Sequence, residues 1–112
     1  MPKTPKKREK VLYGKTVRVD TGCGKLYLTI NKDKEGKIYE VFCKMEKTGS
    51  CFSSICESLA RMITLVFRLD GGQDLIAKHL MGIECPSKID TCKSCPDAIG
   101  RIIQEIDKPQ TN

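Results

Sequence analysis

Residues 17–31, with the sequence VRVDTGCGKLYLTIN, decide the fold of this 112-residue chain. Apolar side chains recur in it at every second position: Val17, Val19, Leu26, Leu28 and Ile30. A period of two is typical of strands with one buried face. The turn-forming residues 21–24 separate the two runs and are few enough for a hairpin connection. The stretch therefore predicts two antiparallel strands.

The chain after this hairpin predicts a third strand and then helices. Period two returns over 39–45 after a turn at 31–36. From residue 50 or 51 to the terminator Asp70-Gly-Gly72 the period is helical, with one apolar stripe: Phe52, Ile55, Cys56, Leu59, Ile63 and Val66. A shorter helix is expected from Gln73 or Asp74 to Leu80, followed by a loop over 83–95.

The last helix has the clearest signals. Pro96 suits the first helical position, Asp97 complements the positive helix start, and Cys95 is expected at the N-cap. An apolar stripe follows at Ile99, Ile102, Ile103 and Ile106. The fold class predicted is α+β, with a three-stranded antiparallel meander packed against three C-terminal helices.

Charge and composition divide the chain. The net charge is +6, and residues 1–10 hold five Lys/Arg against one Glu. We expect 1–10 to be a disordered basic tail, 11–108 to be one domain and 109–112 to be a flexible C-terminus. The tail could add weak attraction to nucleic acid or another polyanion. No apolar run approaches the roughly 20 residues of a membrane span, and no signal peptide is visible, so we expect a cytoplasmic protein without membrane contact.

Seven cysteines suggest the chemistry. An odd number without an export signal favours metal or redox use over a disulfide framework. Cys43 and Cys56 occupy apolar-facing positions and are interpreted as buried small hydrophobes. The other five fall at turns and helix starts, where thiolates are favoured: Cys23, Cys51, Cys85, Cys92 and Cys95. A tetrahedral zinc site needs four such ligands.

Other chemistry-bearing residues form no pattern. His79 is the only histidine, and no Ser/His/Asp arrangement can be assembled around it. The acidic residues of the predicted hairpin are expected to be solvated charges: Asp33, Glu35, Glu40 and Glu46. No glycine-rich phosphate loop is present.

Five short motifs, in order, resemble the TSCPD domain: Thr21 to Asn31, Tyr39 to Phe42, Thr48-Gly-Ser-Cys51, Glu84-Cys-Pro86 and Ser94-Cys-Pro-Asp-Ala-Ile99. That domain closes many adenosylcobalamin-dependent (class II) ribonucleotide reductases and also occurs in small stand-alone proteins. The position of the family's name-giving Thr is Lys93 here. The resemblance implies metal ligands at Cys23, Cys51, Cys85 and Cys95, with Cys92 as a spare or alternate ligand. The order of the cysteines is also similar to the iron–sulfur scaffold fold.

Three functions follow as hypotheses. The first is a stand-alone, non-catalytic, zinc-binding accessory module for ribonucleotide reduction (and so for DNA synthesis), with a reductase large subunit as partner. The second is a dithiol of Cys92 and Cys95 that re-reduces a reductase active site, which needs a depressed pKa at Cys95. The third is an iron–sulfur scaffold-like protein that holds a cluster in place of zinc. A complete reductase is excluded, because 112 residues cannot build its barrel and cobalamin site.

Overall fold

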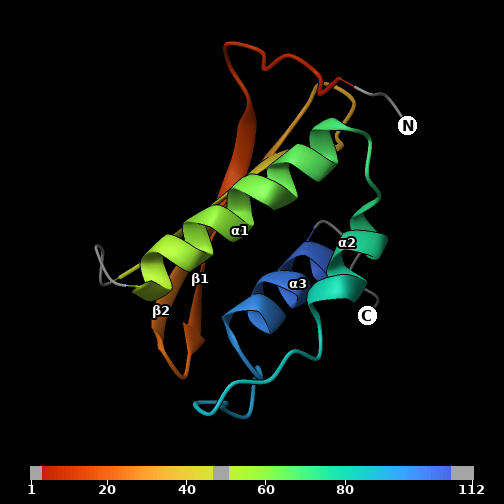
Figure 1. Cartoon of the computed structure of the whole chain (residues 1–112). Helices are drawn as coiled ribbons and strands as arrows, with labels where there is room; N and C mark the ends of the chain where they lie inside the picture. The colour runs from red at the N-terminus through yellow and green to blue at the C-terminus, as the bar shows by residue number, and fades with distance from the viewer. Residues whose placement is uncertain (1–3, 47–50, 107–112) are drawn as a thin grey trace, which may run out of the picture.

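The structure of the chain is a computed structural model that describes residues 4–46 and 51–106. Its sheet contains β1 (Tyr13–Thr21), β2 (Gly24–Lys32) and β3 (Ile38–Met45), in the order β1-β2-β3. Both pairings are antiparallel, and Val17, Leu28 and Cys43 lie opposite one another across the three strands. The predicted meander is confirmed (Figure 1).

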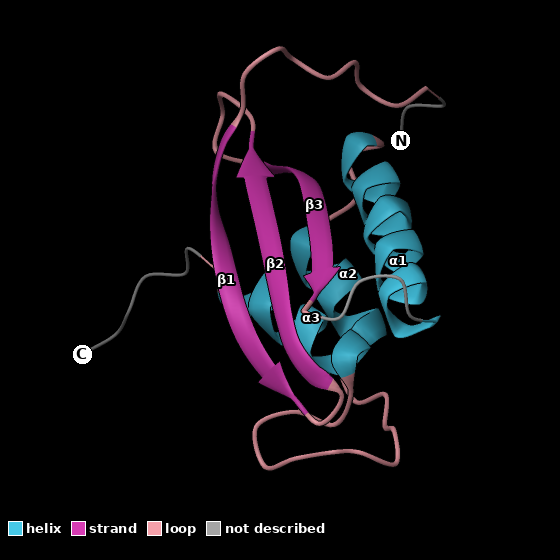
Figure 2. Cartoon of the chain, turned by 90° about the vertical axis from the view of Figure 1, so that its left-hand side faces the viewer, coloured by secondary structure: helices cyan, strands magenta, loops and turns pink. Residues whose placement is uncertain are grey.

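Three helices complete the fold: α1 (Cys51–Arg68), α2 (Gln73–Leu80) and α3 (Cys95–Glu105). They lie together on one side of the sheet (Figure 2). Leu26, Leu28 and Ile30 of β2 are at most 1% exposed, as are Ile99 and Ile103 of α3. These side chains form the centre of the core, and the α+β class is confirmed.

The apolar stripe expected on α1 is partly wrong. Phe52 and Ile55 are 57% and 61% exposed, and the buried residues of the helix are Cys56, Ala60, Ile63 and Phe67. The reason is that α1 lies along the outer edge of β3. There the Thr64 hydroxyl donates to the Val41 carbonyl (3.0 Å) and accepts from the Val41 N–H (2.9 Å). This contact turns a different face of the helix toward the core.

The N-terminal arm, defined here as residues 4–10, makes specific contacts. The Lys6 N–H donates to the Arg68 carbonyl (2.9 Å), and the Tyr39 hydroxyl donates to the Lys6 carbonyl (2.7 Å). Arg8 donates two hydrogen bonds, of 2.8 and 2.9 Å, to the Glu40 carboxylate. The expectation of a disordered tail over 1–10 stays a prediction. Residues 1–3 and the predicted flexible C-terminus at 109–112 lie outside the described residues.

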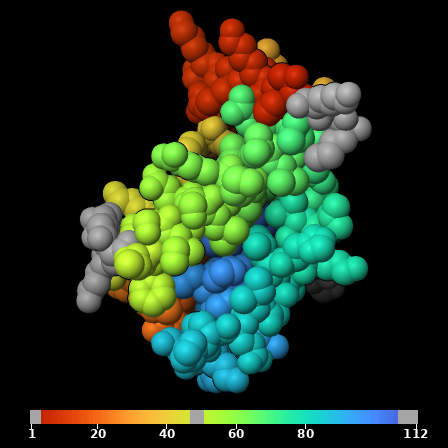
Figure 3. Space-filling view, in the orientation of Figure 1, coloured from red at the N-terminus to blue at the C-terminus, as the bar shows by residue number. Residues whose placement is uncertain are grey.

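The two ends of the molecule are built differently. The arm covers one end, and the segment after α2 forms the opposite end (Figure 3). The turn at 22–23 and the beginnings of α1 and α3 lie at that second end (Figures 1 and 2). Within the described ranges, no helix is both long enough and apolar enough to cross a bilayer.

Candidate thiol site

Three segments come together at the end of the sheet opposite the arm: the β1–β2 turn, the loop between α2 and α3, and the start of α3 (Figures 1 and 2). They carry Cys23, Cys85 and Cys95. The start of α1, which carries Cys51, lies toward the same end but apart from them (Figure 1). The convergence of all four cysteines on one site stays a prediction.

Thr21 organises the turn that carries Cys23. Its hydroxyl donates to the Gly24 carbonyl (2.7 Å) and accepts from the Cys23 N–H (3.2 Å). The same oxygen lies 3.5 Å from the Cys95 sulfur. Gly24 has a φ of 125°, which only glycine adopts readily. Thr21 was not predicted as a site residue, since its role depends on Cys95, 74 positions later.

The start of α3 is fixed by Ser94. This residue is the N-cap: its hydroxyl accepts from the Asp97 N–H (3.1 Å) and donates to the Ile83 carbonyl (2.6 Å). The expectation of Cys95 at the N-cap is thus wrong by one residue, because a serine oxygen is the better acceptor for a free helical N–H. Cys95 is the first residue of the helix and is 5% exposed.

Asp97 holds the loop between α2 and α3. Its carboxylate is fully buried and accepts from the N–H groups of Gly82 and Lys93 and from Nε of Arg101, each at 2.8 Å. Burial raises the pKa of Asp97, but these three donors outweigh it and hold the pKa below its ordinary value. The loop is also pressed against the turn, because a Cβ at Gly22 would overlap the Ser87 carbonyl.

The thiols themselves form a connected cluster. Cys23 interacts with both Cys95 and Cys85 strongly enough to shift its pKa, and Cys95 interacts in the same way with Cys56. Cys56 contacts Cys43 in turn, so the cluster extends from the surface into the core. Cys43 and Cys56 are buried, as predicted, but their contact with the site was not predicted. Nothing in a local sequence pattern indicates a contact between Cys56 and Cys95.

The protonation of this cluster differs from expectation. Burial and then the neighbouring Cys95 and Cys85 raise the pKa of Cys23 to about 11. The interaction with Cys43 is the main cause that raises the pKa of Cys56 to about 11. The Cys56 thiol and burial raise the pKa of Cys95 as well, so the depressed pKa expected there is wrong. The helix start is outweighed because like groups crowd a low-dielectric space.

Cys51 and Cys92 stand apart from these contacts. Cys51 is exposed at the first residue of α1. Cys92 is buried, with its sulfur 3.8 Å from the Asp20 carbonyl, and burial followed by the nearby Asp97 raises its pKa. All seven cysteines are free. Over residues 4–46 and 51–106, no group of three or more His, Cys, Asp or Glu side chains is already arranged to hold a metal ion.

Two further residues test the expectations for the rest of the chain. His79 is exposed on α2. Glu40 is a correction: it was expected to be a solvated charge and is 3% exposed. Arg8 and the Asn31 side chain donate to its carboxylate, which only the arm makes possible.

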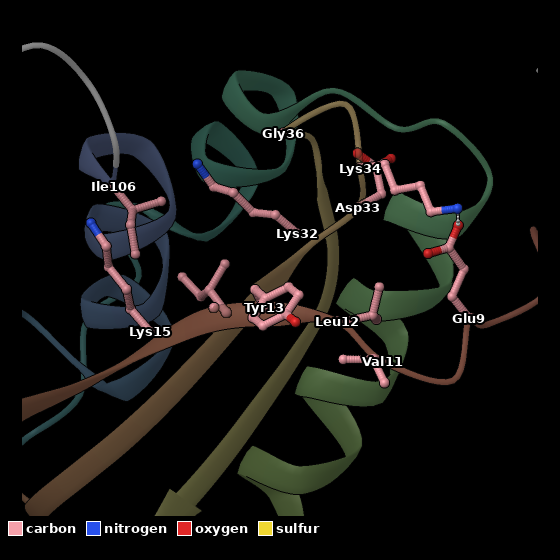
Figure 4. A pocket seen from close by; sticks show the side chains of 12 residues that line it. Glu9, Val11, Leu12, Tyr13, Lys15, Lys32, Asp33, Lys34, Gly36 and Ile106 are labelled. Atoms are coloured by element: carbon pink, nitrogen blue, oxygen red, sulfur yellow. Dashed lines mark ion pairs between the residues drawn. The ribbon is translucent and has the colours of Figure 1, made fainter.

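A cavity of about 650 Å³ lies away from the thiols, near the start of β1. Tyr13, Lys15, Lys32 and Ile106 are among the residues that line it (Figure 4). No cysteine lines this cavity, so it is separate from the thiol site.

Comparison with known proteins gives one match. The family model of the TSCPD domain matches residues 3–107, which is nearly the whole chain, and confirms the resemblance seen in the sequence motifs. No curated protein and no solved structure matches.

Proposed function

Because the chain belongs to the TSCPD domain family, we propose that it holds zinc through cysteine thiolates and serves ribonucleotide reduction as a non-catalytic accessory module. The ligands in this proposal are Cys23, Cys51, Cys85 and Cys95. Zinc, when bound, would supply the positive charge that lets four thiols ionise and would tie four distant segments together.

The observation that carries the proposal is the interaction of Cys23 with both Cys85 and Cys95, beside the 3.5 Å approach of the Thr21 hydroxyl to the Cys95 sulfur. These three residues come from the β1–β2 turn, the α2–α3 loop and the start of α3. Three separate segments of the fold therefore each contribute a cysteine to this end of the molecule. The raised pKa of Cys23 and of Cys95 fits a donor set without its cation, since crowded thiols stay protonated until a positive charge offsets their burial.

The fourth ligand in the proposal, Cys51, lies on α1 rather than in the thiol cluster. The beginning of α1 lies at the same end of the fold as the other three segments (Figure 1). A thiolate at the first residue of a helix is favoured by the free N–H groups there. Cys51 is exposed, and in this proposal metal binding brings the start of α1 to the other three cysteines.

The chain's own residues hold the donors in place. Thr21 contacts the Cys95 sulfur and binds the backbone on either side of Cys23. Asp97 fixes the loop of Cys85 by accepting from Gly82 and Lys93, and the Cys85 N–H donates to the Lys93 carbonyl (3.0 Å). These contacts hold the backbone segments that carry Cys23, Cys85 and Cys95 in place without a metal.

The geometry gives less support to the dithiol hypothesis. Attack on a disulfide needs a thiolate, and burial is the main cause that raises the pKa of Cys92. The pKa of Cys95 is raised too, and both sulfurs are buried.

The first experiment is a metal-to-protein ratio measured on the purified chain and on single Cys→Ser variants. We expect about one zinc per chain. Cys23→Ser, Cys51→Ser, Cys85→Ser and Cys95→Ser should each lose the metal and lower the unfolding free energy. Cys43→Ser is the matched control, since it is also a buried thiol, and it should lower stability while keeping the zinc.

Two results would contradict the proposal. One is a metal-free chain whose mass is two protons lower, which would show a disulfide. The other is an iron chromophore with acid-labile sulfide, which would show a cluster. The link to a reductase is tested separately, by titrating the zinc-loaded chain into an adenosylcobalamin-dependent reductase and measuring binding and turnover.

A further inference from the structure

The outer face of the sheet carries aromatic and basic side chains in neighbouring rows. Side chains alternate along each strand, and the row facing away from the helices includes Arg18 of β1, Tyr27 of β2 and Lys44 of β3, which lie opposite one another. The next row contains Thr16, Thr29 and Phe42. α2 and α3 lie on the other side of the sheet, and α1 lies along the edge of β3 (Figure 2).

The apolar part of this face is unusual for a solvated surface. Phe42 is 54% exposed, and Tyr27 is half-buried on the central strand. Since Tyr27 lies opposite Lys44, it is the diagonal neighbour of Phe42, and diagonal neighbours across strands lie about 7–8 Å apart, within reach of two aromatic rings. The two rings therefore form a pair of adjacent flat surfaces on the open side of the sheet.

The exposed charges nearest the rings are positive. Arg18 and Lys44 are exposed, and within residues 4–46 and 51–106 neither takes part in an ion pair. The groove beside Phe42 is also lined by Arg61, which pairs with Glu57, and by Arg68 of α1. The acidic side chains of this face are Glu40, which is buried and paired with Arg8, and Asp20 and Glu46, which lie toward the hairpin end, beyond the aromatic pair.

We propose that this face binds single-stranded nucleic acid, with two successive bases stacked on Tyr27 and Phe42 and with Arg18 and Lys44 contacting the phosphates. Aromatic rings on an open sheet can stack bases of any sequence, because every base has a flat face, and lysine and arginine beside them neutralise the backbone. Thr16 and Thr29 bind each other through their hydroxyls (2.8 Å), so the floor between the strands is polar and close-fitting. An apolar protein segment would find only two rings there, whereas a polyanion with flat bases matches both the rings and the charges.

The test is fluorescence anisotropy on the full chain with labelled oligo(dT) and oligo(U) of about twelve nucleotides, at about 50 and 200 mM salt. Phe42→Ala and Tyr27→Ala should each weaken binding about tenfold. Lys44→Gln should reduce the slope of log affinity against log salt by about 0.7. Comparing the two oligomers distinguishes DNA from RNA as the ligand.

The matched control is Tyr13→Ala. Tyr13 is 82% exposed in the same sheet, but by alternation it lies on the opposite face, with Val17 and Val19. Its replacement by alanine should therefore leave the affinity for the oligomers unchanged. Circular dichroism and thermal unfolding of each variant show whether the fold is kept.

Several outcomes would overturn the assignment. One is an absence of binding at 50 mM salt, or binding that is equally tight at 200 mM salt. Another is an equal loss of affinity in Tyr13→Ala and Phe42→Ala. Loss of binding in Lys7→Gln/Lys10→Gln with no effect of Phe42→Ala would place the contact on the arm instead. Equally tight binding of polyglutamate, with the same dependence on Phe42, would make the partner an acidic protein surface.

Discussion

The two ends of the sheet each bury one carboxylate, and they satisfy it in different ways. At the thiol end, Asp97 binds two backbone N–H groups and Arg101, and two of these donors are only four residues away in the sequence. At the arm end, Glu40 binds Asn31 and the Arg8 guanidinium, which is 32 residues away. In both cases burial raises the pKa of the carboxyl, and the donors more than offset it.

The two carboxylates differ in what holds their hydrogen-bond donors in place. Asp97 is held by the backbone of the loop that carries Cys85 and Cys92, so its donors cannot leave without unfolding that loop. Glu40 is held partly by a side chain of the arm, and Arg8 is itself half exposed. If the arm moves away, water can replace Arg8 at Glu40. The thiol end should therefore be the rigid end, and the arm end the one that opens first.

The largest expected effect is that of Asp97→Asn. The amide keeps the volume but cannot accept from all three donors, so at least one of the N–H groups of Gly82 and Lys93 or the Arg101 side chain loses its partner. We expect the unfolding free energy to fall by about 2–4 kcal/mol, measured by denaturant titration.

Asp90→Asn is the control for this change, because Asp90 is an exposed carboxylate in the same loop. Its effect should stay within about 0.5 kcal/mol. If the two variants lost equal stability, the loop would not depend on the buried carboxylate, and the contrast between the two ends would disappear.

Glu40→Gln should have a smaller effect, about 1 kcal/mol, since the amide still accepts one hydrogen bond from Arg8 or Asn31. The sharper measurement is hydrogen exchange of the Lys6 N–H, which donates to the Arg68 carbonyl. Its protection should fall in Glu40→Gln and stay unchanged in Glu35→Gln, where the carboxylate is exposed on the β2–β3 turn. Protection that survives in Glu40→Gln would show that the arm is held by other contacts.

The sequence predicted the parts of this fold that local patterns determine. The meander follows from period two, and α3 follows from its proline and its apolar stripe, although its N-cap is Ser94 rather than the predicted Cys95. The segments that carry the cysteines could be placed at one end of the molecule because they are turns and helix starts.

The missed features are those that need a distant partner. The exposure of Phe52 and Ile55 depends on α1 lying against the edge of β3 through Thr64. The burial of Glu40 depends on Arg8, and the contact of Cys56 with Cys95 joins positions 39 residues apart. No period or cap in a single sequence encodes such contacts.

The smallest expected effect is the alkaline sensitivity of the metal-free chain, and it concerns the thiol end alone. Burial, and then the neighbouring Cys95 and Cys85, raise the pKa of Cys23 from its ordinary value of 9.0 to about 11 in the folded state. Between these values the folded chain holds a proton that the unfolded chain has released, so stability is full below pH 9 and is lost as the pH rises through 11. Thermal unfolding in chelator across this range should show a falling midpoint that is flatter in Cys23→Ser. Bound zinc should remove the dependence, because zinc-bound thiolates carry no proton to lose. A midpoint that falls equally in Cys23→Ser would assign the titration to lysine and tyrosine side chains elsewhere. The protonated thiols would then contribute nothing to the stability of the thiol end.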